Sequence, residues 1–157
     1  MILYNRKCVL SKQTHTTNIR IVTEDDADIT RLMQVHQLHE VSQFISIGDN
    51  YFHYVTNTPY VYFYKVYEGN SLIGSIHLEK PDNVLYMDIL VFPEFQGRGY
   101  GTKIIKDIQR DLFDLNYERI EVSVDENNFA SLNLFRNAGF TFVSQEDGLL
   151  DFVYTKG

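Results

Sequence analysis

Residues 91–101 read VFPEFQGRGYG, and this stretch decides both the fold and the binding chemistry of the chain. An apolar, strand-like run stops at Pro93, a glycine-rich turn follows, and an amphipathic helix begins after Gly101. That order aims several backbone N–H groups and the positive end of a helix dipole at one point in space. The stretch therefore predicts a site for a phosphate or a pyrophosphate.

Strand and helix signals on both sides of this turn predict a βαβ unit beside antiparallel strands. Aromatic and β-branched residues predict strands at Tyr60–Tyr67, Ser71–Glu79 and Val84–Phe92, which turn residues join into an antiparallel meander. Helical spacing predicts a helix over Thr102–Leu115, and alternation predicts a strand over Arg119–Val124. Because a helix separates the last two strands, they are expected to pair in parallel through a right-handed crossover.

The remaining elements complete a fold of the α/β (α+β) class. Ile19–Val22 reads as a strand, and Thr23 with Asp26 forms a capping-box pattern before a helix. A helical or irregular piece covers Val41–Gly48, and Asn128 opens a helix that precedes a closing hairpin. Together the elements predict a mixed, mostly antiparallel sheet of about six to seven strands, flanked by about four helices, with one central βαβ unit.

Composition and charge restrict the class of protein further. The 157 residues suit one domain, 1–157, in which residues 1–17 form an N-terminal extension that is either an added edge strand or a homodimer contact. The net charge of −7 argues against a nucleic-acid partner. No apolar run approaches the roughly 18 residues of a membrane span, and the start lacks the order of a signal peptide. With Cys8 as the only cysteine, the sequence favours a cytoplasmic protein that has no membrane partner.

Three interpretations of the glycine turn compete on spacing alone. A P-loop requires Gly-Lys-Ser/Thr, whereas this chain has Gly101, Thr102 and Lys103 in that order. A dinucleotide fingerprint requires G-x-G-x-x-G and an acidic residue that ends the next strand, whereas the spacing here is G-x-G-x-G and Glu121 lies inside that strand. The third interpretation is a tight strand-to-helix connection with glycines for steric reasons alone.

A second motif favours one family of phosphate ligands. Gln96, Gly99 and Gly101 match the Gln/Arg-x-x-Gly-x-Gly/Ala core of motif A in the GNAT superfamily of acyl-CoA-dependent N-acetyltransferases. Residues 128–140, NFASLNLFRNAGF, resemble the second motif of that family, and the resemblance covers roughly residues 19–155. It implies a GNAT-like fold, in which the strand before the turn splays away from its parallel neighbour, and acetyl-CoA as the co-substrate.

The resemblance also implies which residues hold acetyl-CoA. Backbone N–H groups of the turn would receive the pyrophosphate, and glycines would allow its close approach. The pantetheine arm would bond to the splayed strand, and Asn128 matches a side-chain contact to that arm, although asparagine also caps helices. Arg98, Lys103 and Arg136 are candidates to meet the nucleotide phosphates, with plain surface charge as the alternative. The implied cofactor-binding residues are Leu90, Val91, Gln96, Gly97, Arg98, Gly99, Tyr100, Gly101, Thr102, Asn128 and Phe135.

Acetyl transfer to an amine requires a base, because an amine with a pKa near 10.4 is protonated at neutral pH. Asp88 is the first candidate, since it interrupts an apolar strand and shares a face with Tyr86 and Leu90 by alternation. The alternative for Asp88 is a solvent-facing aspartate. Glu79 and His77 on the neighbouring strand are weaker candidates for the base.

Phe135 stands where the family usually has a Tyr that protonates the leaving thiolate. This difference leaves three alternatives. Another hydroxyl takes the place of the Tyr hydroxyl, water protonates the thiolate, or the chain binds acyl-CoA without good turnover. Residues 48–52 are a candidate rim for the acceptor, and His36, His39 and His53 lack metal-ligand spacing, so no metal is predicted.

The sequence thus predicts an N-acetyltransferase that transfers an acetyl group from acetyl-CoA to a primary amine of a small molecule or a peptide N-terminus. The amine would attack directly in a ternary complex. The alternative is an acyl-CoA-binding sensor or a catalytically weak regulatory module of the same fold.

Overall fold

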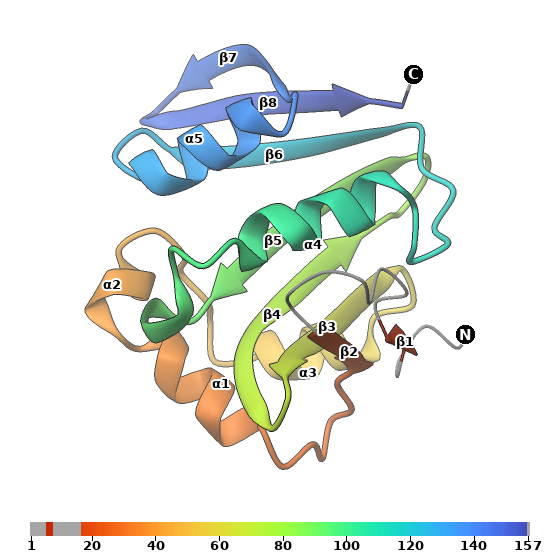
Figure 1. Ribbon diagram of the computed structural model, residues 1–157, viewed down its shortest axis with the longest axis vertical. Helices are drawn as coiled ribbons and strands as arrows, with labels where there is room; N and C mark the ends of the chain where they lie inside the picture. The colour runs from red at the N-terminus through yellow and green to blue at the C-terminus, as the bar shows by residue number, and fades with distance from the viewer. Residues whose placement is uncertain (1–5, 8–16, 157) are drawn as a thin grey trace.

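One mixed sheet with helices on both faces organises the computed structural model, which describes residues 6–7 and 17–156 (Figure 1). Neighbouring strands follow the order β1-β2-β3-β4-β5-β6-β8-β7, and only β5 and β6 pair in parallel. The strands are β1 (Arg6–Lys7), β2 (Thr17–Ile21), β3 (Val61–Glu68), β4 (Ser71–Glu79), β5 (Val84–Val91), β6 (Arg119–Asp125), β7 (Thr141–Glu146) and β8 (Leu149–Thr155). The helices are α1 (Ile29–His36), α2 (His39–Ser42), α3 (Tyr51–Asn57), the 3-10 helix η1 (Pro93–Phe95), α4 (Tyr100–Gln109) and α5 (Phe129–Asn137).

This arrangement confirms the predicted fold class, the meander β3-β4-β5 and the parallel crossover from β5 to β6. Seven strands have five or more residues, and the eighth, β1, is a two-residue edge strand paired with β2. The other residues of the predicted N-terminal extension 1–17, apart from Thr17, lie outside the described residues. Five α-helices flank the sheet rather than about four, because the segment between α1 and β3 forms two short helices, α2 and α3.

Two apolar cores lie on opposite faces of the sheet. Successive residues Phe63 and Tyr64 of β3 enter different cores, as the alternation of a strand requires. One core packs α4 and α5 against the sheet through residues such as Ile105, and the other packs α1, α2 and α3 through residues such as Leu32. The second core contains no residue of β6, β7 or β8 among the described residues, and Ser123 of β6 is exposed. The C-terminal half of that face is therefore uncovered.

Helix α4 is shorter than the predicted helix Thr102–Leu115. It ends at Gln109, because the chain enters the left-handed region at Asp111 with φ 56°. The Asp111 carboxylate accepts hydrogen bonds from the backbone N–H of Leu115 at 2.9 Å and of Asn116 at 3.1 Å. Leu115 lies in the loop after α4, yet its side chain still reaches the core. The apolar spacing of a helix therefore continues in the sequence beyond the end of the helix. No helix in the described part of the chain is long and apolar enough to cross a membrane.

The predicted capping box before α1 is wrong. The residue that precedes α1 is Asp28, and the Thr23 hydroxyl donates to the Asp25 carboxylate at 2.9 Å instead of capping the helix. Asp26 accepts from the ammonium group of Lys65 on β3 at 2.9 Å, and Asp28 accepts from the same group at 2.7 Å. The carboxylate that resembled a cap therefore pairs with a half-buried lysine of the sheet.

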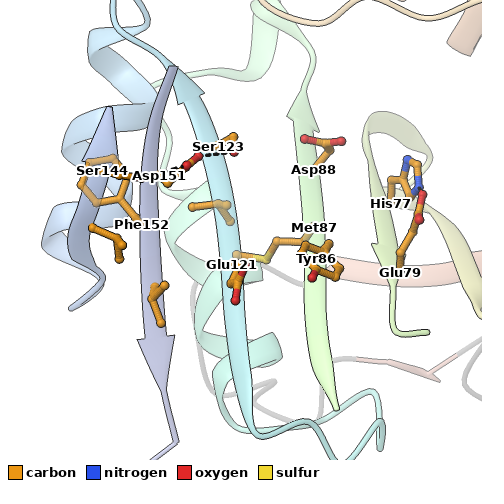
Figure 2. Close-up of a pocket in the computed structure, with 13 residues that line it drawn as sticks. His77, Glu79, Tyr86, Met87, Asp88, Glu121, Ser123, Ser144, Asp151 and Phe152 are labelled. Carbon is orange, nitrogen blue, oxygen red and sulfur yellow. Dashed lines mark hydrogen bonds and ion pairs between the residues drawn. The ribbon is translucent and has the colours of Figure 1, made fainter. Parts of the chain in front are cut away.

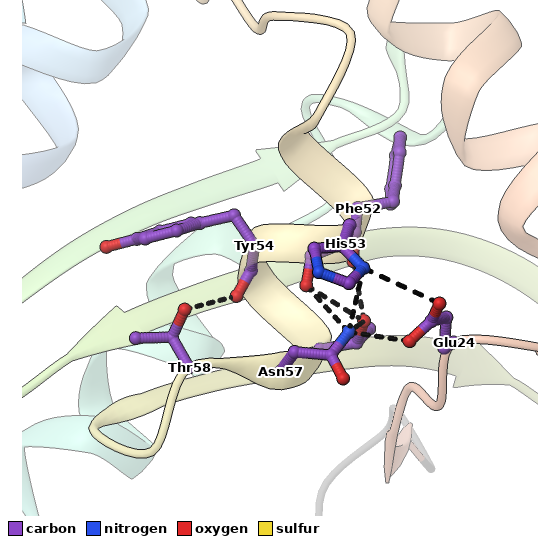
Figure 3. Close-up of polar contacts among 7 residues, drawn as sticks. Glu24, Phe52, His53, Tyr54, Asn57 and Thr58 are labelled. Carbon is purple, nitrogen blue, oxygen red and sulfur yellow. Dashed lines mark hydrogen bonds and ion pairs between the residues drawn. The ribbon is translucent and has the colours of Figure 1, made fainter.

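Polar contacts on its outer side hold α3 in place (Figure 3). The Asn57 side-chain amide donates to Glu24 at 2.6 Å, and Nδ1 of His53 lies 3.5 Å from the same carboxylate. The Thr58 hydroxyl donates to the backbone carbonyl of Tyr54 at 2.7 Å and closes the last turn. These contacts tie α3 to the segment before α1, and this sets the orientation in which α3 faces β4.

Strands β5 and β6 separate after a short parallel ladder. The paired residues are Val84 with Arg119, Leu85 with Ile120, and Tyr86 with Glu121. Beyond Tyr86, β5 stays paired with β4, while β6 stays paired with β8. The predicted splayed strand pair is thus confirmed, and the edges of both strands face an opening.

Candidate active site

The glycine turn follows β5 directly and connects it to α4. Gly97 and Gly99 have φ values of +78° and +88°, in the left-handed region that residues with a Cβ rarely adopt. A Cβ added at either position would meet no protein atom within 4 Å. Backbone conformation therefore selects glycine at these two positions, and the space next to them is open.

Hydrogen bonds fix the shape of this turn. The Gln96 side-chain amide donates to the backbone carbonyl of Val91 at 3.0 Å and ties the turn to the end of β5. The Lys103 N–H donates to the Gly99 carbonyl at 3.1 Å, as the first bond of the helical ladder. The two amides just before Lys103 precede that ladder at the positive end of the helix dipole. This geometry suits a pyrophosphate, as the sequence predicts.

Two predicted turn residues direct their side-chain positions into the protein. A Cβ at Gly101 would lie 3.1 Å from a methyl group of Leu134, so close packing of α4 against α5 explains this glycine. The Tyr100 hydroxyl donates to Glu68 at 3.3 Å, and the Tyr100 ring is buried. At both positions only the backbone remains available to a ligand at the turn.

Of the three predicted cationic contacts, Arg98 and Arg136 are exposed and Lys103 is buried. Arg98 is exposed, and its guanidinium donates to the backbone carbonyl of Glu94 at 3.2 Å. Lys103 is buried and pairs with Asp107 one helical turn later at 3.1 Å. Because Lys103 is buried, it is no longer a candidate for a phosphate contact. Arg98 remains a candidate.

Two cavities share lining residues on β4 and β5, beyond the end of the β5–β6 ladder. The strand-side cavity, of about 390 Å³, is lined by β4, β5, β6, β7 and β8 (Figure 2). The helix-side cavity, of about 230 Å³, is lined by α1, the segment between α2 and α3, the start of α3, β4 and β5. His77 of β4 and Asp88 of β5 line both cavities and lie opposite one another in the β4–β5 ladder. A molecule in either cavity would therefore reach the same pair of side chains.

Asp88 lies on the face that the alternation predicts. Tyr86 lines the strand-side cavity with it, and Leu90 lines the helix-side cavity. Asp88 is exposed to solvent, as the solvent-facing alternative predicts, and it lies opposite His77 in the β4–β5 ladder. Desolvation by the surrounding protein raises the pKa of the Asp88 carboxyl, while the His77 ring lowers it and the Glu79 carboxylate raises it by smaller amounts. The raised pKa makes Asp88 a stronger base than an ordinary aspartate.

A hydroxyl, an imidazole and a carboxylate form a hydrogen-bonded chain next to Asp88. The Tyr51 hydroxyl lies 2.9 Å from Nδ1 of His77, and Nε2 of His77 lies 2.7 Å from Glu79. The Tyr54 hydroxyl donates to the other oxygen of Glu79 at 3.1 Å. The sequence did not predict this chain, because Tyr51 and His77 are 26 residues apart on different elements and no local spacing connects them.

Asn128 and Phe135 of the second motif lie on α5. The Asn128 side chain accepts a hydrogen bond from the Ser131 N–H at 3.3 Å, so Asn128 caps the helix, and its contact to pantetheine stays a prediction. The Phe135 ring is buried in the core at 5.1 Å from the ring of Phe140. Neither residue is among those that line the two cavities.

His36, at the end of α1, lines the helix-side cavity and is 5% exposed. Neither of its ring nitrogens has a hydrogen-bond partner in residues 6–7 and 17–156. Its ring packs against Tyr51 and Phe52, with centroid distances of 5.6 and 6.0 Å. Burial, with a smaller contribution from His77, lowers the pKa of His36 to about 4, so the ring is neutral at pH 7.

We expect the protein to lose stability as the pH falls from about 6.5 to about 4, because the unfolded chain binds a proton at His36 in that window and the folded chain does not. The free energy of unfolding should fall by about 2 kcal/mol between pH 7 and pH 5 from this residue alone. Urea unfolding at both pH values measures it. The His36→Leu variant should remove this part of the pH dependence, whereas His39→Gln, at an exposed position, should keep it. Equal pH dependence in wild type and His36→Leu would contradict the assignment.

The fold and the site define an α/β domain with a glycine turn at a helix N-terminus beside an opened strand pair. Among the described residues, no group of three or more His, Cys, Asp or Glu side chains is arranged to hold a metal ion. The family model of the acetyltransferase (GNAT) family matches residues 28–140. The chain therefore belongs to the GNAT acetyltransferase family.

Individual relatives agree with this membership. The thialysine N-epsilon-acetyltransferase of Mus musculus is 31% identical over 70 residues, which are 45% of this chain and 41% of that protein. The chain thus spans less than half the length of this relative.

Solved structures show the same fold at low sequence identity. The GNAT domain of S. lividans PAT has a TM-score of 0.75 and 19% identity, covering 89% of this chain and 90% of that chain. The spermidine N-acetyltransferase from Vibrio cholerae, in complex with CoA and spermine, has a TM-score of 0.75 and 14% identity, covering 89% and 95%.

Proposed function

We propose that this protein is an N-acetyltransferase that transfers the acetyl group of acetyl-CoA to a primary amine of a small molecule or a peptide N-terminus. One observation carries the proposal. Asp88, a carboxylate with a raised pKa, lies in the opening where the β5–β6 ladder has ended and before the glycine turn begins. A donor held by the turn and an amine held in a cavity would meet at this residue.

The donor side of the proposal rests on the turn and the opening. The pyrophosphate of acetyl-CoA would bind the backbone amides at the N-terminus of α4, where the dipole favours an anion. The pantetheine arm would then follow the free edge of β5 past Val91 and Leu90. Leu90 lines the helix-side cavity together with Asp88, so this path would bring the thioester to the base.

The acceptor side rests on the charge of the cavities. Glu79, Asp88 and Glu121 line the strand-side cavity, and the whole chain has a net charge of −7. These carboxylates favour a cationic amine over a neutral or acidic acceptor. The similar proteins described above, a thialysine acetyltransferase and a spermidine acetyltransferase, support the same class of acceptor.

The proposed reaction is a direct transfer in a ternary complex. Asp88 removes a proton from the ammonium group, and the neutral amine attacks the thioester carbonyl carbon. The C–N bond forms, backbone N–H groups of the splayed strand stabilise the oxyanion, and the C–S bond then breaks. Because Asp88 lines both cavities, donor and acceptor can be bound beside the same base, and no covalent acetyl-enzyme is needed.

The test is CoA release from acetyl-CoA across a panel of amines that includes a polyamine, an aminoglycoside, a free amino acid and a peptide with a free N-terminus. We expect release that saturates with acetyl-CoA and with at least one cationic amine. Acetyl-CoA without amine is the control for hydrolysis. Saturable CoA binding without turnover on any amine would contradict the enzyme and favour an acyl-CoA-binding sensor, which the lack of a hydroxyl at Phe135 motivates.

A further inference from the structure

We propose that Tyr51, His77 and Glu79 form a proton relay that moves a proton from the attacking nitrogen to the leaving thiolate. The relay rests on the proposed acetyltransferase function and adds residues to it. Tyr51 would exchange protons with the reactants, His77 would hold the proton in transit, and Glu79 is the positioning residue that acts through His77.

The hydrogen-bond geometry defines the direction of the relay. Nε2 of His77 lies 2.7 Å from the Glu79 carboxylate, which only accepts, so this nitrogen carries a hydrogen. In the neutral ring Nδ1 is then an acceptor, and it lies 2.9 Å from the Tyr51 hydroxyl, which donates to it. The order hydroxyl, imidazole, carboxylate is that of a nucleophile-activating triad, with a tyrosine as the outer hydroxyl.

Tyr51 lies where both reactants are expected. It lines the helix-side cavity together with Asp88 and Leu90. Those two residues are the proposed base and the proposed neighbour of the thioester. The contacts of α3 with Glu24 on its outer side hold the helix that carries Tyr51 (Figure 3). The Tyr51 ring packs at 5.9 Å from the buried ring of Phe63, and this contact helps to hold the ring in place beside His77.

Tyr51 would pass protons on and would not hold a charge. Burial raises the pKa of Tyr51, and the carboxylates of Asp88 and Glu79 raise it further, so a tyrosinate is strongly disfavoured. A proton that arrives at its oxygen must therefore be matched by one that leaves to Nδ1 of His77. The Glu79 carboxylate stabilises the imidazolium that forms.

The protons balance over one turnover. Asp88 takes the first proton from the ammonium group and releases it to water. After attack, the nitrogen of the tetrahedral intermediate gives its second proton to the Tyr51 oxygen, while the Tyr51 hydroxyl proton moves to His77. When the C–S bond breaks, His77 returns a proton through Tyr51 to the sulfur. The products are the amide and CoA thiol, and the relay regains its starting state.

This relay accounts for the absence of a hydroxyl at Phe135. The thiolate would receive its proton from Tyr51 on α3, on the other side of the sheet from Phe135 in the α5 core. The titratable groups that face His77 come from its own strand and from three other elements. They are His36 on α1, Tyr51 and Tyr54 on α3, Glu79 on β4 and Asp88 on β5.

The Tyr51→Phe variant tests the relay, because it removes the hydroxyl and keeps the ring packing. We expect kcat to fall about 100-fold, at the low end of the effect of general acid–base catalysis, with the Kd of CoA within twofold of wild type. Glu79→Gln should also lower kcat and change its pH profile, since an amide does not stabilise an imidazolium. The double variant should be no slower than the slower single variant, because residues that act as a unit are not additive.

The matched control is Tyr154→Phe, a tyrosine of β8 that packs against the α4–α5 core and lines neither cavity, and its kcat and pH profile should superimpose on those of wild type. An active wild type with unchanged kcat in Tyr51→Phe, or additive losses in the double variant, overturns the relay and leaves the acetyltransferase proposal standing. A wild type without turnover on any amine overturns both.

Discussion

The Gly99→Val variant is expected to bind CoA at least about 100-fold more weakly than wild type while it keeps its fold. The backbone φ of +88° at Gly99 places the residue in the left-handed region, which a β-branched residue adopts only at a cost of about 1–3 kcal/mol. A shift of the turn relieves that strain and moves the amides away from the pyrophosphate. The valine side chain also extends into the open space next to the turn, where no protein atom lies within 4 Å of the added Cβ. Titration of CoA by calorimetry measures the Kd.

The control separates strain from loss of the ligand site. Gly148 lies between β7 and β8 with a φ of +80°, so Gly148→Val carries comparable backbone strain at the far edge of the sheet. Both variants should lower the melting temperature by a similar amount, and only Gly99→Val should lose CoA binding. Unchanged CoA affinity in Gly99→Val would mean that the phosphate assignment of the turn is wrong.

The Asp88→Asn variant is expected to lower kcat by about 100-fold to 10,000-fold, the range for loss of a general base. The amide has nearly the shape of the carboxyl, so the binding of CoA should stay within twofold. The pH profile gives a second readout. Because desolvation by the surrounding protein raises the pKa of Asp88, the wild-type rate should fall as the pH decreases through a value above the ordinary range of aspartate. The variant should lack that acidic limb.

The matched control for this prediction is Asp114→Asn, at an exposed position outside both cavities. Its left-handed φ of 57° is one that asparagine tolerates, so the exchange removes one carboxylate without strain. Steady-state kinetics between pH 5 and 9 on both variants, with one amine at saturation, is the measurement. A wild-type acidic limb that persists in Asp88→Asn would remove Asp88 from the mechanism.

Local chemistry explains which parts of the fold were predictable from the sequence. The meander, the crossover and the C-terminal hairpin have strong alternation, and turn residues such as Gly148 mark their ends. The end of α4 was not predictable from periodicity, because Leu115 continues the apolar pattern from a loop that the Asp111 carboxylate holds. The start of α1 was missed because Asp26 pairs with Lys65, which is distant in the sequence.

In the candidate site, too, some residues can be predicted from the local sequence and others depend on tertiary packing. The glycine turn is a local motif, so its residues and its geometry follow from one stretch of sequence. Asp88 was accessible to prediction because a single acid stands out in an apolar strand. The Tyr51–His77 contact depends on how α3 packs against β4, and nothing in the local pattern of either segment indicates it. Tertiary packing alone also shows that Gly101 serves the contact with Leu134.

The three residue pairs between β5 and β6 have a consequence for how ligands and folding are linked. If acetyl-CoA occupies the opening as we propose, its pantetheine amides would take the place of the missing ladder, and the co-substrate would act as an inserted strand. Part of the free energy of CoA binding would then be free energy of sheet formation, so the loaded protein would resist unfolding more than the empty one. An amine would meet a finished sheet only after the donor has bound, which makes donor first, acceptor second the natural order of binding.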